Sequence, residues 1–137
     1  MNDIITDITN YVAGWMDWNL CLDMQGGPNW VENTVDSPII IDATKQEYYK
    51  QPMWYALGHF SKFVRPNSYR IQSSFEISPP AGIKEVAFMT TDGTRVVVLE
   101  NTDSTSSRTV SINEVHNPTL YFNVVLEPHS IATVVLN

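Results

Sequence analysis

Residues 85–99 read Glu-Val-Ala-Phe-Met-Thr-Thr-Asp-Gly-Thr-Arg-Val-Val-Val-Leu, and this stretch decides the fold class of the second half of the chain. Two β-prone runs flank Asp92-Gly93, a dipeptide typical of a β-hairpin with a type I′ turn, which requires positive φ. Similar runs separated by turn-forming residues continue on both sides. About six short strands at this spacing predict an antiparallel β-sandwich over residues 68–137. The predicted strands cover residues 70–75, 85–90, 95–99, 109–112, 119–126 and 131–136.

Residues 1–67 follow a different pattern, which is typical of an α/β unit. An apolar stripe with helical spacing predicts a first helix over residues 4–13, with Asp3 as its N-cap. A second helix is predicted from roughly Gln51 to Phe63, where Pro52 lies near the first turn, and Arg65-Pro66 closes it. The stripe of the first helix consists of Ile4, Ile5, Ile8, Tyr11 and Val12.

The segment between these helices combines strand and loop signals. Residues 14–20 alternate as a strand does and contain two tryptophans. Residues 21–51 are rich in turn formers and predict a long loop, with one short strand at 39–41. The two helices and the Trp-bearing strand need neighbours that these residues do not supply, so the pattern indicates part of a larger fold.

Length and charge exclude several classes of protein. A complete (β/α)₈ barrel takes about 250 residues, whereas this chain has 137. With 8 basic and 15 acidic residues, a net charge of −7 and no cluster of Lys or Arg, the chain is a poor nucleic-acid binder. The apolar runs are far shorter than the roughly 20 residues of a membrane-spanning helix. No secretory signal opens the sequence, so if the protein works in a secreted or lysosomal compartment, we expect its address to lie outside these residues.

Cysteine and histidine usage predicts no metal site. Cys21 is the only cysteine, which excludes a disulfide within the chain, and we expect it to be a partly buried apolar residue. His59, His116 and His129 are widely spaced and form no ligand motif.

Three stretches carry a resemblance to a known family. They are Gly-Trp-Met-Asp-Trp-Asn-Leu at 14–20, Gly-Gly-Pro-Asn-Trp-Val at 26–31 and Gly-His-Phe-Ser-Lys-Phe at 58–63. Together with Asp-Ser-Pro-Ile-Ile at 36–40, they resemble the C-terminal part of the glucosylceramidases of glycoside hydrolase family 30. The resemblance spans nearly the whole chain and implies that residues 1–67 are the last elements of a (β/α)₈ barrel. Residues 68–137 would be most of a β-sandwich that receives strands from both chain ends.

The resemblance also implies where the chemistry lies. Retaining β-glucoside hydrolysis needs two carboxyl groups about 5–5.5 Å apart. In the family these are glutamates at the ends of the fourth and seventh barrel strands, which precede residue 1 here. No glutamate of this chain matches a catalytic position, so we expect no catalytic residue in it and no activity from these residues alone. The glutamates present are Glu32, Glu47, Glu76, Glu85, Glu100, Glu114 and Glu127.

Two residues match the family's sugar pocket. The resemblance implies that Trp18 and Asn33 bind substrate: the indole offers an apolar face and an N–H donor, and the amide reaches sugar hydroxyls. The alternatives are barrel packing for Trp18 and loop capping for Asn33. Glu32 and Thr34 replace a basic and an aromatic residue of the human-like pattern, which affects the loop that carries Asn33.

The neighbouring polar and aromatic residues have plainer interpretations. We expect Asp17 to be structural, Asp36 to be a turn residue and Trp15 to pack in the core. A group of aromatic residues suggests either a hydrophobic entrance for a ceramide chain or a membrane surface, or simply packing of the last helix. These are Trp30, Tyr48, Tyr49, Trp54 and Tyr55.

Two functional hypotheses follow. The first is the C-terminal part of a glucosylceramidase-like hydrolase that cleaves glucosylceramide or a related β-glucoside and needs no metal or organic cofactor. By resemblance, such an enzyme works in the lysosome, at lipid surfaces and with a saposin-type activator protein. The alternative is a non-catalytic truncated protein whose sandwich binds carbohydrate or protein, which the missing catalytic glutamates favour.

Overall fold

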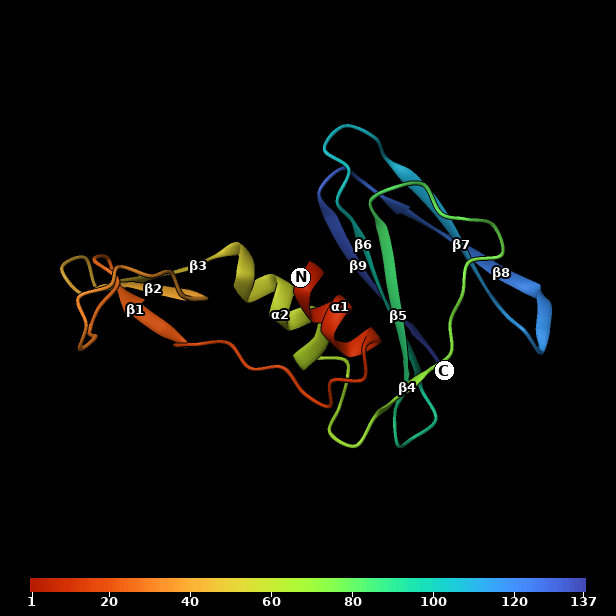
Figure 1. The fold of residues 1–137 in the computed structure, drawn as a ribbon, viewed down its shortest axis with the longest axis horizontal. Helices are drawn as coiled ribbons and strands as arrows, with labels where there is room; N and C mark the ends of the chain where they lie inside the picture. The colour runs from red at the N-terminus through yellow and green to blue at the C-terminus, as the bar shows by residue number, and fades with distance from the viewer.

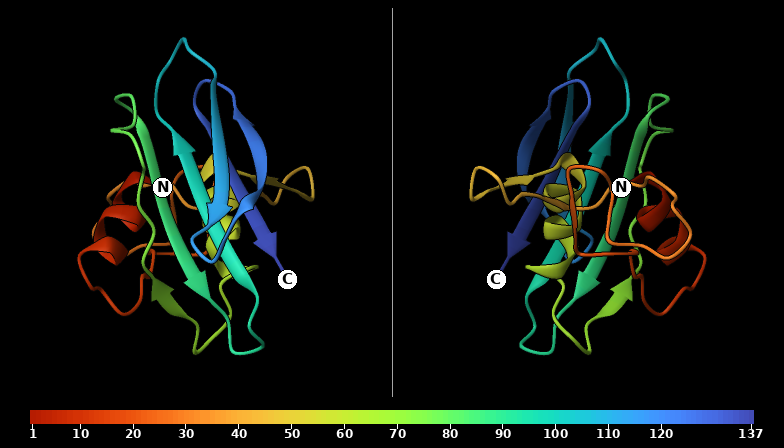
Figure 2. Two further views of the ribbon diagram at one scale, coloured as in Figure 1. Left: turned by 90° about the vertical axis from the view of Figure 1, so that its right-hand side faces the viewer. Right: turned by 90° about the vertical axis from the view of Figure 1, so that its left-hand side faces the viewer.

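The chain forms two helices and nine strands in the computed structural model, which describes residues 1–137 except for the side chains of Pro118 and Leu120. A four-stranded sheet lies between a helical layer and a two-stranded ribbon, and a small three-stranded sheet extends to one side (Figures 1 and 2). The helices are α1 (Asn2–Thr9) and α2 (Pro52–Ser61). The strands are β1 (Cys21–Asp23), β2 (Ile39–Asp42), β3 (Glu47–Lys50), β4 (Tyr69–Ile71), β5 (Ile83–Met89), β6 (Arg95–Asn101), β7 (Arg108–Glu114), β8 (Asn117–Leu126) and β9 (Ser130–Leu136).

The central sheet has the order β4-β5-β6-β9 and is antiparallel throughout. Strand β6 lies inside it and is covered on both faces, which explains its unbroken apolar run. Val96 and Val98 belong to a core that also contains residues of α1, whereas Leu99 belongs to a second core shared with β8. Alternating side chains of one strand therefore hold two layers in place.

The hairpin between β5 and β6 was predicted correctly, but its turn type was not. A type I′ turn needs positive φ at both central residues, and here only Gly93 of the loop has it, at 85°. The Gly93 N–H donates to the Thr90 carbonyl, and the Thr90 N–H donates to the Thr94 carbonyl. This is the three-residue hairpin loop in which a glycine in the left-handed region follows an ordinary turn. Asp92 supports it by accepting hydrogen bonds from Thr90 and Thr94.

Strands β7 and β8 form a ribbon that faces the central sheet and completes the sandwich. The core between the two consists of Ile83, Leu99 and Leu126, with Phe75, Val97 and Val110 packed around it. All the strands predicted for residues 68–137 are present, and the antiparallel sandwich is confirmed. The first is shorter than predicted, because its pairing with β5 ends at Ile71.

Both predicted helices are present and pack on the outer face of the central sheet (Figure 2). Helix α1 contributes the buried Ile5, and α2 contributes Phe60, whose ring meets that of Phe88 edge to face at 6.4 Å between centroids. The sequence predicted that both helices need packing partners outside these residues. The central sheet provides such a partner for each of them. Helix α1 begins earlier than predicted: Met1, not Asp3, is the N-cap, and Asp3 lies in the first turn.

The prediction of a strand over residues 14–20 was wrong. These residues belong to no sheet. The backbone hydrogen bond that the described residues make to them runs from the Ile39 N–H to the carbonyl of Leu20, directly before β1, and a strand needs a row of such pairs. The predicted long loop instead contains a sheet of order β1-β2-β3. Of its strands, only β2 was predicted; β1 pairs parallel to β2, and β3 pairs antiparallel.

The small sheet is tied to the start of α2. The Gln51 N–H donates to the carbonyl of Pro38 at 2.9 Å, which joins the residue before α2 to the residue before β2. Pro52 then occupies the first turn of α2, where its missing N–H costs nothing. The small sheet therefore continues from the N-terminal end of α2, away from the sandwich (Figure 1).

A polar contact also joins α2 to the sandwich. Nδ1 of His59 lies 2.8 Å from Oγ1 of Thr133 on β9, and the two groups share a hydrogen bond. His59 is half-buried, and this burial lowers its pKa below the usual value of 6.5.

This contact predicts a pH dependence of stability. Because the folded state disfavours the charged imidazole, His59 contributes full stability above pH 6.5 and loses it as the pH falls toward the lowered pKa. We expect the free energy of unfolding, measured in urea at several pH values, to fall less between pH 7.5 and 5 in His59→Gln than in the unsubstituted chain. His116→Gln, at an exposed position, is measured alongside as the control. If the free energy of unfolding of His59→Gln changes with pH as much as that of the unsubstituted chain, His59 is not the source of the pH dependence.

Candidate functional site

The loop between β1 and β2 is built around the carboxylate of Asp23. Its Oδ1 accepts hydrogen bonds from the backbone N–H groups of Gln25 (2.9 Å) and Gly27 (2.8 Å). The backbone of Asp23 closes the same turn, since its N–H donates to the Gly27 carbonyl and its carbonyl accepts from Gly26. One side chain thus organises the turn that follows β1, as short acidic residues do in loops.

The two arms of this loop cross at Gly26. Its φ is +80°, and a Cβ placed on it would lie 2.9 Å from the carbonyl oxygen of Val35. Only glycine allows this conformation and this close approach of the two backbones. The crossing fixes where the second arm, residues 33–36, returns toward β2.

Asn29 fastens the tip of the loop. Its Nδ2 donates to the carbonyls of Gly26 (3.0 Å) and Asn33 (2.9 Å). Between them, Glu32 has a φ of 53°, a left-handed conformation that costs a non-glycine residue about 1–2 kcal/mol. The side chain of Asn33 is exposed and makes no hydrogen bond with any described residue. Its amide is therefore free to bind a ligand.

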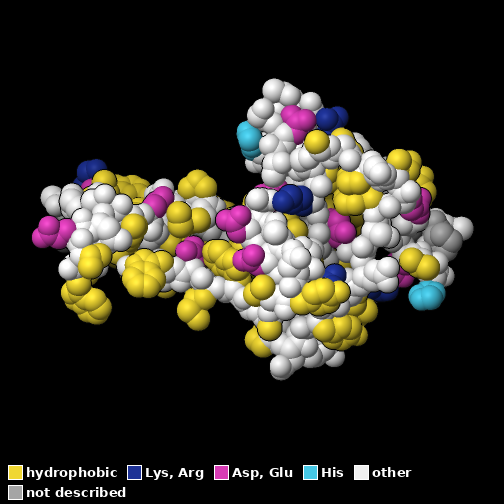
Figure 3. Space-filling view, viewed as in Figure 1, with side chains coloured by type: hydrophobic (Ala, Val, Ile, Leu, Met, Phe, Trp, Pro, Cys, Tyr) yellow, Lys and Arg dark blue, Asp and Glu magenta, His cyan; other side chains and the backbone are white. Residues whose placement is uncertain are grey.

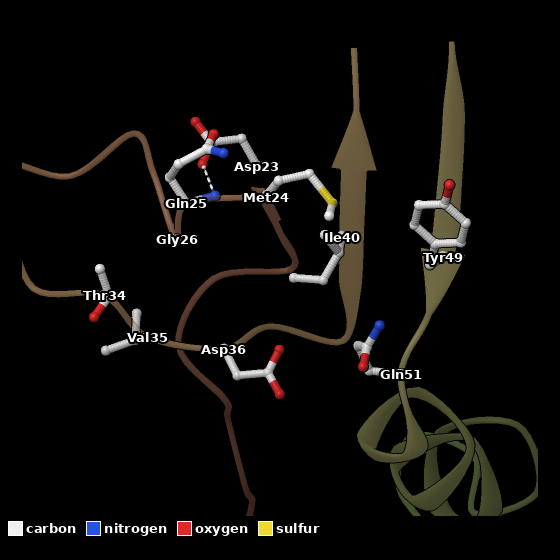
Figure 4. A pocket seen from close by; sticks show the side chains of 10 residues that line it. All are labelled: Asp23, Met24, Gln25, Gly26, Thr34, Val35, Asp36, Ile40, Tyr49 and Gln51. Atoms are coloured by element: carbon white, nitrogen blue, oxygen red, sulfur yellow. Dashed lines mark hydrogen bonds between the residues drawn. The ribbon is translucent and has the colours of Figure 1, made fainter. Parts of the chain in front are cut away.

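An open cleft of about 510 Å³ lies between this loop and strands β2 and β3 (Figure 4). Its polar lining groups are carboxylates, amides, an aliphatic hydroxyl and a phenol, and Met24, Val35 and Ile40 add apolar surface. The cleft contains Thr34 but neither Asn33 nor Trp18. Its polar lining consists of Asp23, Gln25, Thr34, Asp36, Tyr49 and Gln51.

Trp18 lies on the extended segment before β1 and is 77% exposed. No hydrogen bond between described residues joins it to Asn33, and neither of these two predicted substrate-binding residues lines the cleft. Asp17 accepts a hydrogen bond from the Trp18 N–H at 2.9 Å, in keeping with its predicted structural role. The prediction that Trp15 packs in the core was wrong: it is 38% exposed, and its indole N–H donates to Asp7.

The glutamates of this chain form no hydrolytic pair in the cleft, which none of them lines. Glu100 on β6 is buried, and burial raises its pKa. Three others border a second cavity, of about 680 Å³, between the central sheet and the ribbon. Each of these already has a partner: Glu76 accepts from Asn113, Glu85 from Ser73, and Glu114 pairs with Arg95.

The described residues show neither a metal-binding cluster nor a spanning helix. No three His, Cys, Asp or Glu side chains among them are grouped to hold an ion. Neither α1 nor α2 is long and apolar enough to cross a membrane. Cys21 is exposed, in contrast to its predicted partial burial.

The group of aromatic residues lies largely on the surface of the small sheet and α2. Trp30 is fully exposed, and Tyr48 and Tyr55 are mostly exposed, so packing of the last helix does not account for them. Trp54 is covered in part by Lys50, whose Nζ lies 5.2 Å from the ring centroid. Apolar side chains protrude from this side of the molecule (Figure 3).

Two models of protein families match the chain, and together they cover nearly all of it. Residues 1–64 match the glycosyl hydrolase family 30 TIM-barrel domain, and residues 67–134 match the glycosyl hydrolase family 30 beta sandwich domain. The chain belongs to glycoside hydrolase family 30. It comprises the C-terminal part of the family's barrel followed by its β-sandwich, as predicted.

Curated relatives of this family 30 chain include several glucosylceramidases. Putative glucosylceramidase 4 of Caenorhabditis elegans is 44% identical over 98% of this chain. The lysosomal acid glucosylceramidase of Mus musculus is 50% identical over 75% of it. An endo-1,6-beta-D-glucanase of Aspergillus fumigatus is 30% identical over 69%. The chain spans between a fifth and about a quarter of the length of these relatives: 26%, 20% and 20%, respectively.

Solved structures agree with this membership. SrfJ from Salmonella typhimurium superposes with a TM-score of 0.88 at 30% identity, covering 98% of this chain and 28% of that one. An endo-beta1,6-glucanase superposes with a TM-score of 0.79 at 26% identity, covering 94% and 28%. The arrangement of helices, small sheet and sandwich is therefore shared with family members that are several times longer.

Asn29 and Asp23 are site residues that the sequence reasoning missed. An asparagine after Gly-Pro is a common turn former, so its type alone gave no reason to single it out. The available signal for Asn29 was its position four residues before Asn33. At that spacing an asparagine side chain can reach the backbone of Asn33 and close the loop.

The crossing of the loop arms predicts a local effect of Gly26→Ala. Positive φ and the close Val35 backbone should destabilise the loop by about 2 kcal/mol, which corresponds to a roughly thirtyfold larger open population. Cleavage by chymotrypsin at Trp30, under conditions where opening and closing are fast relative to cleavage, measures this population. Gly14→Ala is the control, because a Cβ there meets no atom within 4 Å. Equal cleavage rates for the two variants contradict the assignment.

Proposed function

We propose that these residues form the C-terminal part of a retaining β-glucosidase that hydrolyses glucosylceramide to glucose and ceramide. The ranking of relatives carries the proposal. Glucosylceramidases match 98% of the chain at 44% identity, whereas an endo-1,6-beta-D-glucanase of the same family matches 69% of it at 30%. Substrate-binding loops diverge with specificity, so the closer similarity favours a glucosylceramide-type glucoside.

The two carboxyl groups of the reaction are assigned to barrel strands outside these residues. One protonates the leaving oxygen, and the other attacks the anomeric carbon to form a glycosyl-enzyme that water then hydrolyses. The present chain supplies sugar-binding groups. The indole of Trp18 packs against the C–H face of the sugar, and the Asn33 amide binds its hydroxyls. The exposure of both side chains and the free amide of Asn33 support these roles.

The second cavity, between the central sheet and the ribbon, supports the proposal that these residues are part of a larger protein. The central sheet has four strands and the ribbon two, and about 680 Å³ remains between them. Apolar side chains such as Phe75, Val97 and Leu99 border this space, so further chain packed there would bury additional apolar surface.

The proposal includes a lysosomal location, contact with a lipid surface and a saposin-type activator. The name of the mouse relative supports the location. The exposed Trp30, Tyr48 and Tyr55 support a lipid contact, because aromatic side chains with one polar end favour membrane interfaces.

The proposal is tested with the complete enzyme that contains these 137 residues. We expect glucose release from glucosylceramide in detergent micelles and none from a β-1,6-glucan. Trp18→Ala should lower kcat/KM about thirtyfold, which corresponds to ~2 kcal/mol of lost apolar contact in the transition state. Tyr121→Ala removes an aromatic side chain of similar exposure from the sandwich and should leave kcat/KM unchanged.

Absence of glucosylceramide hydrolysis by the folded complete enzyme overturns the proposal. If the isolated chain then binds defined glycans on an array, the alternative of a non-catalytic binding module replaces it.

A further inference from the structure

We infer that Asn29 is a positioning residue, which holds Asn33 in the conformation in which the Asn33 amide binds the hydroxyls of a β-glucoside. The inference rests on the proposed function. Asn29 acts through Asn33 and does not itself touch the sugar.

The hydrogen bonds of Asn29 give it one defined orientation. Its two acceptors, the carbonyls of Gly26 and Asn33, both need a donor, so the NH₂ group must face them. Each of its two N–H groups serves one carbonyl, at 3.0 and 2.9 Å. The amide oxygen Oδ1 points away and is buried without a partner among the described residues.

The two hydrogen bonds of Asn29 join the rigid backbone at Gly26 to the weakly held backbone at Asn33. Gly26 is fixed by the turn around Asp23 and by its close approach to Val35. At the other end, the bond from Asn29 to the Asn33 carbonyl is the only hydrogen bond between described residues that reaches residues 30–33. Asn29 is therefore what transmits the rigidity of the first arm to Asn33.

The backbone next to Asn33 shows why such a support is needed. Glu32 is held at a φ of 53°, which an unsupported non-glycine residue rarely keeps. Without the Asn29 bond, Glu32 is expected to relax toward negative φ, and this rotation reorients the peptide and the side chain that follow. The Asn33 amide then no longer faces the sugar hydroxyls, so the loss falls on substrate binding.

The isosteric substitution Asn29→Asp separates the hydrogen bonds from the shape. It keeps the size of the side chain but turns carboxylate oxygens toward two carbonyl oxygens, so both bonds become repulsive. At low pH the new carboxyl takes up a proton and regains one donor, since the usual pKa of Asp is about 3.9. Asn29→Ala removes both bonds at every pH.

Steady-state kinetics of the complete enzyme on a soluble aryl β-glucoside test the inference. We expect Asn29→Ala and Asn29→Asp to raise KM about tenfold at pH 6.5 and to change kcat less than about threefold, because Asn33 binds the sugar before and during the reaction. Relative to the unsubstituted enzyme, the KM of Asn29→Asp should recover in part at pH 4, and that of Asn29→Ala should not recover.

Asn101→Ala is the matched control. Asn101 is a buried asparagine of β6 whose Nδ2 donates to the carbonyls of Ser106, Leu126 and Glu127. Its substitution should lower the melting temperature and leave KM unchanged in the folded enzyme. If the Asn29 variants likewise lose stability with an unchanged KM, Asn29 is only a structural residue and the inference is wrong.

The outcomes distinguish this inference from the proposed function. An unsubstituted enzyme that hydrolyses no β-glucoside overturns both. An active unsubstituted enzyme together with an unchanged KM in Asn29→Asp overturns the role of Asn29 alone.

Discussion

Burial of β6 on both faces is the constraint on which the rest of the structure depends. Val96 and Val98 hold α1 and α2 against one side of the central sheet, and Val97 and Leu99 hold the ribbon against the other. A strand covered on both faces cannot shift by one residue without exchanging its two sets of side chains. The register of β6 with β5 and β9 therefore sets the position of both outer layers.

The candidate site depends on that core through a short series of contacts. Phe60 of α2 packs on Phe88, and the N-terminal end of α2 is joined to the small sheet by the bond from Gln51 to Pro38. Strand β2 and the crossing at Gly26 then fix the loop whose tip carries Asn33. In the proposed enzyme, the sandwich thus supports one wall of a sugar pocket whose carboxyl groups lie on other barrel strands.

The sequence predicted what local patterns determine. Alternation and helical spacing placed the sandwich strands and both helices, because each pattern matches a face that the fold buries. The strand expected around Trp18 is missing since pairing depends on a neighbour, not on the pattern alone. The turn at Asp92-Gly93 and the bond from Asn29 to Asn33 depend on backbone geometry that single residue types do not encode. Trp18 and Asn33 came from the family resemblance, and their roles stay predictions.

Hydrogen exchange of the 137-residue chain tests the central claim most directly. If the helices are held by the sheet, interior amides of α1 and α2, such as those of Ile8 and Phe60, should open together with those of Val96 and Val98 and show similar protection. Protection of β6 together with helix amides that exchange several orders of magnitude faster would contradict the account. In that case, the central sheet would fold without fixing the helices, and the site would lose its physical support.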